Sequence, residues 1–257
     1  MFVADLVRAM ETIAPTRLAE AWDNVGLLVG DESAPLGRVL LTIDCTRAVV
    51  DEAARGRWDA IVAYHPPIFE PTKRFVAGSI AYECARAGIA VYSPHTAFDV
   101  APGGTNDVLA EAIGMAAARP LRPAAGDAAA VGIGRVGDIE PAPIGAVTER
   151  VKVALGLSHV LLAGPHDRVV SRAATCAGSG GDLIADAVAA GAEVLLTGEV
   201  RHHDALRATA LGLSIVATRH STSERCALPA LERRLAALLP GVAIGRSAAD
   251  RDPFVFA

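Results

Sequence analysis

Aromatic residues are scarce in this sequence, at 4% of its 257 residues, although 52% of the chain is hydrophobic. Much of the apolar content is Ala, Val and Leu, so we expect an interior of close-packed helices and aliphatic strands. Disorder is excluded at this hydrophobicity. The length allows two modest domains or one large α/β domain.

Runs of basic residues are also missing. The formal net charge is -5, and charges of both signs are spread along the chain. A protein that binds nucleic acid through a broad surface needs a basic face that follows the phosphate backbone, so this class of function is excluded. A small nucleotide held in a pocket stays compatible with the sequence.

The four cysteines are isolated from one another and form no CxxC pair. Free, mostly buried thiols in a reducing compartment are therefore expected. Residues 1–15 read as an amphipathic helix with acidic residues and not as a signal peptide. No segment is long and apolar enough to span a bilayer, so we expect a cytoplasmic protein.

Short aliphatic runs alternate with helical stretches, which predicts α/β layers around a largely parallel or mixed sheet. Strands are predicted at 38–44, 58–64, 89–94, 131–137, 159–163, 168–175, 193–197 and 213–218. Helices are predicted at 46–56, 77–87, 106–114, 144–155, 201–210 and 222–236, with one more ending near 190. Residues 117–130 lose periodicity and gain Pro and Gly, which indicates a domain boundary.

Three polar residues, His65, Asp99 and His220, lie just past predicted strand ends. Ligands of open α/β sheets bind beyond the carboxyl ends of the strands. If these residues converge, the strand at 213–218 must return beside the first three strands, which makes the first domain discontinuous.

Two domains are predicted on this basis. Residues 1–122 and 212–257 form a discontinuous α/β domain that bears the metal ligands, and residues 123–211 form an inserted second α/β domain.

His65, Asp99, His220 and Glu224 are the candidate ligands of one buried divalent metal, because imidazole and carboxylate groups are common metal ligands. Each has an alternative interpretation. His65 fits a hydrogen-bonded loop residue, Asp99 a turn residue, and Glu224 a residue of the first helical turn. The i,i+4 spacing of His220 and Glu224 places both on one helix face. His95 is a candidate partner that orients a ligand, and it is also a less favoured candidate for a ligand itself.

Gly178, Ser179 and Gly180 lie in a Gly-rich loop between a strand and a helix. Exposed amides there would hold an anion such as a substrate phosphate, although a tight turn explains the glycines almost as well. His202 and His203 begin a helix after a strand end, where they either line the same cavity or are exposed.

Several segments in the same order resemble the Nif-three-like dinuclear metal-centre family, many of whose members are named GTP cyclohydrolase I type 2 homologs. The similar segments are AEAWDNVGLLVGD (19–31), AYHPPIF (63–69), SPHTAFDVAPGGTND (93–107), CAGSGGDLI (176–184), TGEVRHHDA (197–205) and RHSTSE (219–224).

The resemblance implies a two-domain α/β subunit with mixed sheets flanked by helices, which assembles into a toroidal homohexamer with two neighbouring metal ions per subunit. The family's ligands correspond to His65, Asp99, His220 and Glu224, and the glutamate is expected to bridge both ions. Tyr64 stands where the family usually has a first histidine. A phenol is a poor neutral-pH ligand, so one or two ions are compatible with the sequence. From its length, the chain is also expected to lack the large inserted domain of longer relatives.

The expected function is metal-assisted hydrolysis of a nucleotide-like substrate, which in the family's named reaction is GTP. The metal is Zn, Fe, Mn or Ni, and His95, His202 or His203 would shuttle protons. The alternative is a non-catalytic ring that binds or delivers metal and interacts with other proteins. In a third interpretation zinc is purely structural, and chelation would unfold the chain.

Overall fold

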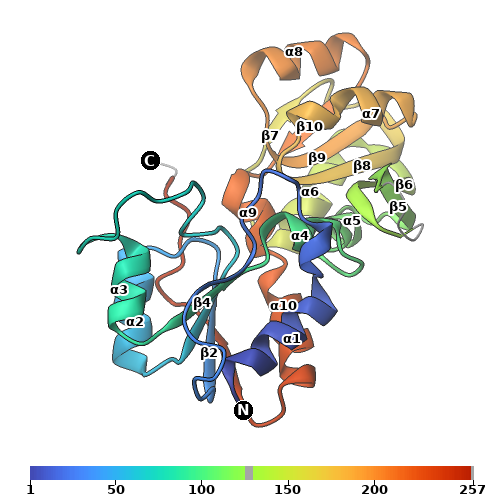
Figure 1. Ribbon diagram of the computed structural model, residues 1–257. Coiled ribbons are helices and arrows are strands. Elements are labelled where there is room, and N and C mark those ends of the chain that lie inside the picture. Colours follow the sequence, from blue (N-terminus) through green and yellow to red (C-terminus); the bar gives the residue numbers. More distant parts are fainter. Residues whose placement is uncertain (125–129, 256–257) are drawn as a thin grey trace. The chain divides into compact units, whose positions relative to one another are not determined.

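The computed structural model describes residues 1–124 and 130–255 (Figure 1). The chain forms two compact units. Unit 1 comprises residues 1–98 and 228–257, and unit 2 comprises residues 99–227. The sequence predicted domain limits after residues 122 and 211. The limits of the two compact units fall after residues 98 and 227 instead, and the predicted domain limits stay predictions.

Unit 1 is built on a five-stranded sheet with the order β1-β4-β3-β2-β11. Its central strands β2, β3 and β4 and the edge strand β11 are parallel, whereas β1 is antiparallel to β4. The strands are β1 (Gly26–Val29), β2 (Arg38–Thr42), β3 (Ala60–Ala63), β4 (Ala90–Ser93) and β11 (Ala243–Arg246). Because β2, β3 and β4 are parallel neighbours, their carboxyl ends lie at one edge of the sheet.

Helices cover both faces of this sheet (Figure 1). They are α1 (Val3–Ile13), η1 (Thr16–Leu18), α2 (Arg47–Gly56), α3 (Ile80–Arg86) and α10 (Leu228–Leu238). The side chains of α2 and α3 pack on one face around Leu40, Ile61 and Val91. The Thr46 hydroxyl caps the start of α2 by accepting a hydrogen bond from the Val49 amide.

Unit 2 contains a six-stranded mixed sheet with the order β5-β6-β8-β9-β10-β7. Strands β8, β9 and β10 are parallel, and β5, β6 and β7 pair antiparallel to their neighbours. The strands are β5 (Ala116–Pro123), β6 (Gly132–Pro143), β7 (Leu161–Ala163), β8 (Val169–Ser179), β9 (Val194–Glu199) and β10 (Ser214–Ala217).

The helices of unit 2 are α5 (Thr105–Ile113), α6 (Ile144–Leu155), η2 (Gly181–Leu183), α7 (Ile184–Ala189), α8 (His202–Ala210) and α9 (His220–Arg225). Alternate strand residues face opposite sides of a sheet. Leu195 and Ile215 accordingly pack with the α7 and α8 layer, and Leu196 and Val216 pack with the α5 and α6 layer. The short helix α4 (His95–Val100) crosses the limit between the two units.

The predicted α/β class with mixed sheets flanked by helices is confirmed. The predicted place of the strand at 213–218 is wrong. This strand is β10, which pairs with β9 and β7 in the sheet of unit 2. Its four residues are all buried, and such a pattern does not specify which sheet a strand joins. The strand that returns beside β2 is β11, which the sequence analysis did not predict.

Two further predictions need correction. Residues 116–123 of the stretch predicted as a boundary form the strand β5, and residues 125–129 lie outside the described residues. The helix predicted at 222–236 is two helices, α9 and α10. Pro229 has no amide hydrogen, so it fits the first turn of α10 but would break a continuous helix.

Among residues 1–124 and 130–255, no helix has both the length and the apolar character needed to cross a membrane.

Candidate metal site

His65 follows strand β3 in unit 1 and is held by a carboxylate. Its Nδ1 lies 2.8 Å from Oδ1 of Asp44, which follows the neighbouring parallel strand β2. A carboxylate accepts a hydrogen bond, so Nδ1 is the protonated nitrogen and Nε2 is the nitrogen that can bind a metal. This carboxylate–histidine arrangement is the one that orients metal-binding histidines in proteins.

His95 follows strand β4 in the same unit and has an equivalent partner. Its Nδ1 lies 2.7 Å from Oδ1 of Asp23, whose side chain is fully buried. Burial favours a higher pKa for Asp23, but hydrogen bonds from His95 and Thr96 outweigh it and hold the pKa below its usual value. Asp23 is therefore ionised at neutral pH and anchors His95 as a hydrogen-bond donor.

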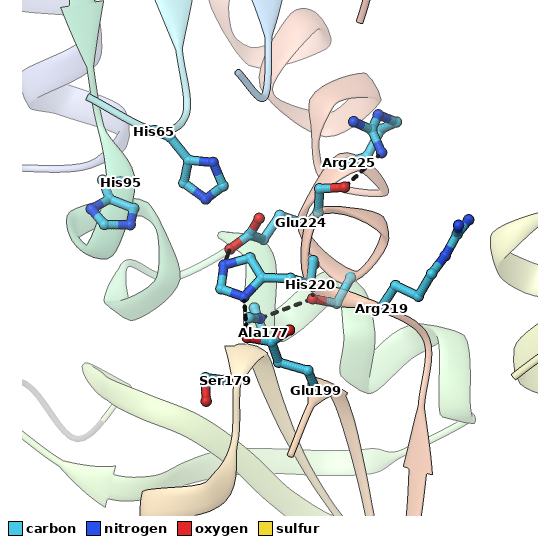
Figure 2. Close-up of polar contacts among 12 residues, drawn as sticks. His65, His95, Ala177, Ser179, Glu199, Arg219, His220, Glu224 and Arg225 are labelled. Carbon is cyan, nitrogen blue, oxygen red and sulfur yellow. Dashed lines mark hydrogen bonds and ion pairs between the residues drawn. The ribbon is translucent and has the colours of Figure 1, made fainter. Parts of the chain in front are cut away.

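His220 and Glu224 form a pair on helix α9 in unit 2 (Figure 2). His220 Nε2 lies 3.1 Å from Glu224 Oε1, and Nδ1 lies 3.1 Å from Oε1 of Glu199, which ends β9. The Glu224 side chain is 3% exposed and that of His220 is 40% exposed. Arg219, directly before His220, has φ +80, an uncommon conformation for a residue with a side chain. The predicted same-face placement of His220 and Glu224 is confirmed.

The two carboxylates change the titration of His220. The hydrogen bond to Glu224 is the largest influence, and with the charges of Glu224 and Glu199 it outweighs burial and raises the pKa of His220 to about 9. Without a cation, the imidazole is therefore protonated on both nitrogens and positively charged at neutral pH. A metal ion that binds here replaces one of these protons.

Gly178 leaves room for the side chains of the His220–Glu224 pair. A Cβ atom at this position would lie 3.1 Å from Glu224 Oε1 and 3.3 Å from the His220 ring. Gly178 also has φ +61, which favours glycine. The backbone of β8 can approach His220 and Glu224 closely because residue 178 has no side chain.

Asp99 lies in α4 and belongs to unit 2. Burial raises the pKa of Cys176 and of Cys226 to about 12, and the negative charges of Asp99 and Glu224 both add to this rise. Both carboxylates are therefore close enough to influence the same two thiols. In the metal-free protein these thiols therefore stay protonated at neutral pH.

The amides of the Gly-rich loop donate within the protein. The Gly178 amide donates to the Ser223 hydroxyl at 2.9 Å, and the Gly180 amide donates to the Glu199 carbonyl at 3.1 Å. Strand β8 also continues to Ser179, and α7 begins only at residue 184. The anion-binding interpretation of 178–180 has no support from these amides, and close approach to the His220–Glu224 pair explains Gly178 better.

His202 and His203 lie at the start of α8 and are both exposed. Their rings are 5.3 Å apart and nearly perpendicular. The surface position agrees with the second of their two predicted interpretations. Their predicted role in proton transfer stays a prediction.

His65, His220 and Glu224 are a candidate group of metal ligands among the residues that the structure describes, and Asp99 is not a member of that group. Two imidazole nitrogens and a carboxylate oxygen suit borderline divalent cations such as Zn, Fe, Mn and Ni. The buried carboxylate of Glu224 fits such an ion, which would replace the proton of His220 as the positive charge beside it.

Sequence reasoning missed Asp44, Asp23 and Glu199, the carboxylates that contact the three histidines. Asp44 and Glu199 could have been found, since each lies at a strand end like the residues that were singled out. Asp23 lies 72 residues from His95 and outside any strand, so position gives no signal for that pairing.

A two-unit α/β protein with a candidate group of histidine and carboxylate ligands is the class that the fold and site define. The chain belongs to the Duf34/NIF3 (NGG1p interacting factor 3) family, whose model matches residues 1–253.

Relatives support this membership over most of the chain. The protein NIF3 homolog of Schizosaccharomyces pombe is 37% identical over 86% of this chain and 84% of its own length. The GTP cyclohydrolase 1 type 2 homolog of Lactococcus lactis is 35% identical over 83% of this chain and 84% of its own length. A Bacillus cereus protein related to NIF3 shares the fold with a TM-score of 0.91 and 24% identity, and the match covers 100% of this chain and 99% of that one.

Proposed function

We propose that this protein binds a divalent metal ion through His65, His220 and Glu224, and that Asp99 contributes to the same site. The observation that carries the proposal is the His220–Glu224 pair. Glu224 places a carboxylate in the interior, 3.1 Å from an imidazole nitrogen on the same helix face. Burial of a carboxylate is costly, and a cation beside it offsets that cost. Inclusion of His65 in the candidate group adds a second imidazole.

The donor atoms limit the choice of metal. Imidazole and carboxylate ligands suit Zn, Fe, Mn and Ni, whereas soft ions prefer thiolates, and the candidate group consists of two histidines and a glutamate. The number of ions per subunit is one or two. Tyr64 would not serve as a neutral-pH ligand for a second ion, because a phenol titrates near pH 10.

We further propose that the site makes the protein a metal-dependent hydrolase of a nucleotide-like small molecule. A bound divalent cation supplies Lewis acidity and lowers the pKa of water toward neutrality. His220 and Glu224 would hold the ion, Asp44 would keep His65 in its orientation, and Gly178 would leave room beside the pair. The name GTP cyclohydrolase 1 type 2 homolog, carried by relatives such as that of Lactococcus lactis, supports this substrate class.

The alternative is a non-catalytic, metal-binding or metal-delivering protein that interacts with other proteins. The description of the family as NGG1p interacting factor 3 favours it, because it names an interaction and no reaction. His220, 40% exposed at its side chain, also suits an ion that exchanges with solvent.

One experiment separates the two functions. Purified protein with a stoichiometric amount of each metal is incubated with GTP, and formate release is measured. The hydrolase proposal expects metal-dependent formate, lost in His220→Ala and kept in His159→Ala, which changes an exposed histidine outside the candidate group. Transfer of the metal to an apo acceptor without formate release would favour the alternative.

A homohexameric ring is proposed from the family resemblance alone. Its test is the mass in solution, which light scattering should find at about six times the 26.4 kDa of one chain. A monomeric or dimeric mass at micromolar concentration would contradict the ring.

A further inference from the structure

Unit 1 contains two histidines of matching construction. His65 and His95 follow the adjacent parallel strands β3 and β4, and each places Nδ1 within 2.8 Å of an aspartate oxygen. The partners are Asp44 and Asp23. In both pairs the carboxylate accepts the Nδ1 hydrogen, which selects the tautomer whose Nε2 can bind a metal.

The separation of the two ring centroids is compatible with one shared ion. Their centroids are 5.4 Å apart and their planes make an angle of 84°. A metal–nitrogen bond of about 2.1 Å places each ring centroid about 3.2 Å from the ion, so two imidazoles at a tetrahedral angle have centroids about 5.2 Å apart. Figure 2 shows the side chains of His65 and His95 as neighbours.

The surroundings of His95 hold its ring in one place. The rings of Trp22, Tyr64 and Phe69 each lie edge-on to it, with centroids 6.0 to 6.3 Å away. The His95 side chain is 14% exposed. Its φ of +27 is unusual for a residue with a side chain, and strain of this kind concentrates at functional sites.

We propose that His95 is a further metal ligand, which shares a divalent, imidazole-binding ion with His65 and is positioned by Asp23. The inference deepens the proposed metal site and rests on it. Unit 1 would then supply two imidazole ligands, and the buried Asp23 carboxylate would orient one of them, His95.

The test measures metal affinity by competition with a chromophoric chelator, using Zn and Co, in the full-length protein. His95→Phe keeps a flat ring among Trp22, Tyr64 and Phe69 and removes both nitrogens. We expect it to weaken binding by about 100-fold, and Asp23→Asn to weaken it by about 10- to 100-fold. His159→Phe, the same change at an exposed position, should leave the affinity unchanged.

A second measurement keeps the proposal testable if His95→Phe does not fold, as judged by circular dichroism. In wild-type protein with ¹¹³Cd and ¹⁵N-labelled histidine, Nε2 of His95 should show a scalar coupling to cadmium. Absence of that coupling while His65 shows one would overturn the inference.

The outcomes also separate this inference from the proposed function. If His220→Ala loses the metal and His95→Phe binds it as tightly as wild type, His95 is a packing residue and only the further inference fails. If wild-type protein binds none of the divalent metals above background, the proposed site and the inference fail together.

Discussion

Gly178 shows how a single missing side chain shapes the candidate site. The His220–Glu224 pair lies so close to the β8 backbone that a Cβ atom at residue 178 would contact both members. In this pair the buried carboxylate of Glu224 lies beside the imidazole of His220, whose pKa is raised to about 9.

Replacement of Gly178 by alanine should therefore weaken metal binding. The new methyl group would lie 3.1 Å from Glu224 Oε1, and the φ of +61 would cost about 1 kcal/mol of stability. Gly156→Ala is a matched control, because Gly156 has φ +66 and nothing within 4 Å of the added atom. Both variants should lose stability in urea unfolding, and Gly178→Ala alone should lose metal affinity. Equal affinities in the two variants would contradict the close approach.

The titration of His220 in metal-free protein gives a second prediction. Its pKa, measured by NMR, should be near 9, and Glu224→Gln should lower it more than Glu199→Gln, because the hydrogen bond to Glu224 is the largest cause of the shift. The folded pKa exceeds the unfolded value of about 6.5, so this group's stabilisation is complete below that pH and is lost as the pH rises through 9. A His220 pKa below 7 in wild type would refute the assignment.

At the scale of elements, the polar residues of the candidate site lie at or just beyond the carboxyl ends of parallel strands in both units. In unit 1 the ends of β2, β3 and β4 lead to Asp44, His65 and His95. In unit 2 strand β9 ends at Glu199, and His220 follows β10 by three residues. This is the edge at which open α/β sheets bind ligands.

Asp44→Asn tests whether this edge orients His65. An amide is a weaker acceptor than a carboxylate and can also present its NH₂ group, so the His65 ring should lose its fixed tautomer and metal affinity should fall about 10- to 100-fold. Asp51→Asn, on the exposed surface of α2, is the control and should bind metal like wild type. Isothermal titration measures both. The role of Asp44 would be refuted if both variants bind equally well.

The sequence predicted where individual helices and strands lie better than it predicted which strands pair and which side chains meet. The helix at 144–155 has the predicted bounds, and β2, β3 and β4 lie within the predicted ranges, because each has a clear apolar pattern between turn residues. Sheet membership depends on contacts between distant residues, so β10 was placed in the wrong sheet. For the same reason the side-chain partners at the site, Asp23 above all, could not be predicted.

At the scale of the whole molecule, the proposed ligands belong to both units. His65 lies in unit 1, and His220 and Glu224 lie in unit 2. One shared ion would therefore make the thermal stability of the full chain depend on metal through residues of both units. A ligand at 100 times its dissociation constant stabilises a folded protein by about 2.7 kcal/mol.

The corresponding prediction compares His65→Ala, His220→Ala and the double variant by the rise in Tm that added metal produces. If one ion is shared, each single variant should lose the metal-dependent rise, and the double variant should lose nothing more, because the same bound ion accounts for both losses. Two independent sites would instead leave each single variant with part of the rise, and only the double variant with none. His159→Ala should keep the full wild-type rise. A metal-dependent rise that survives in His65→Ala but not in His220→Ala would assign the ion to unit 2 alone and remove His65 from the site.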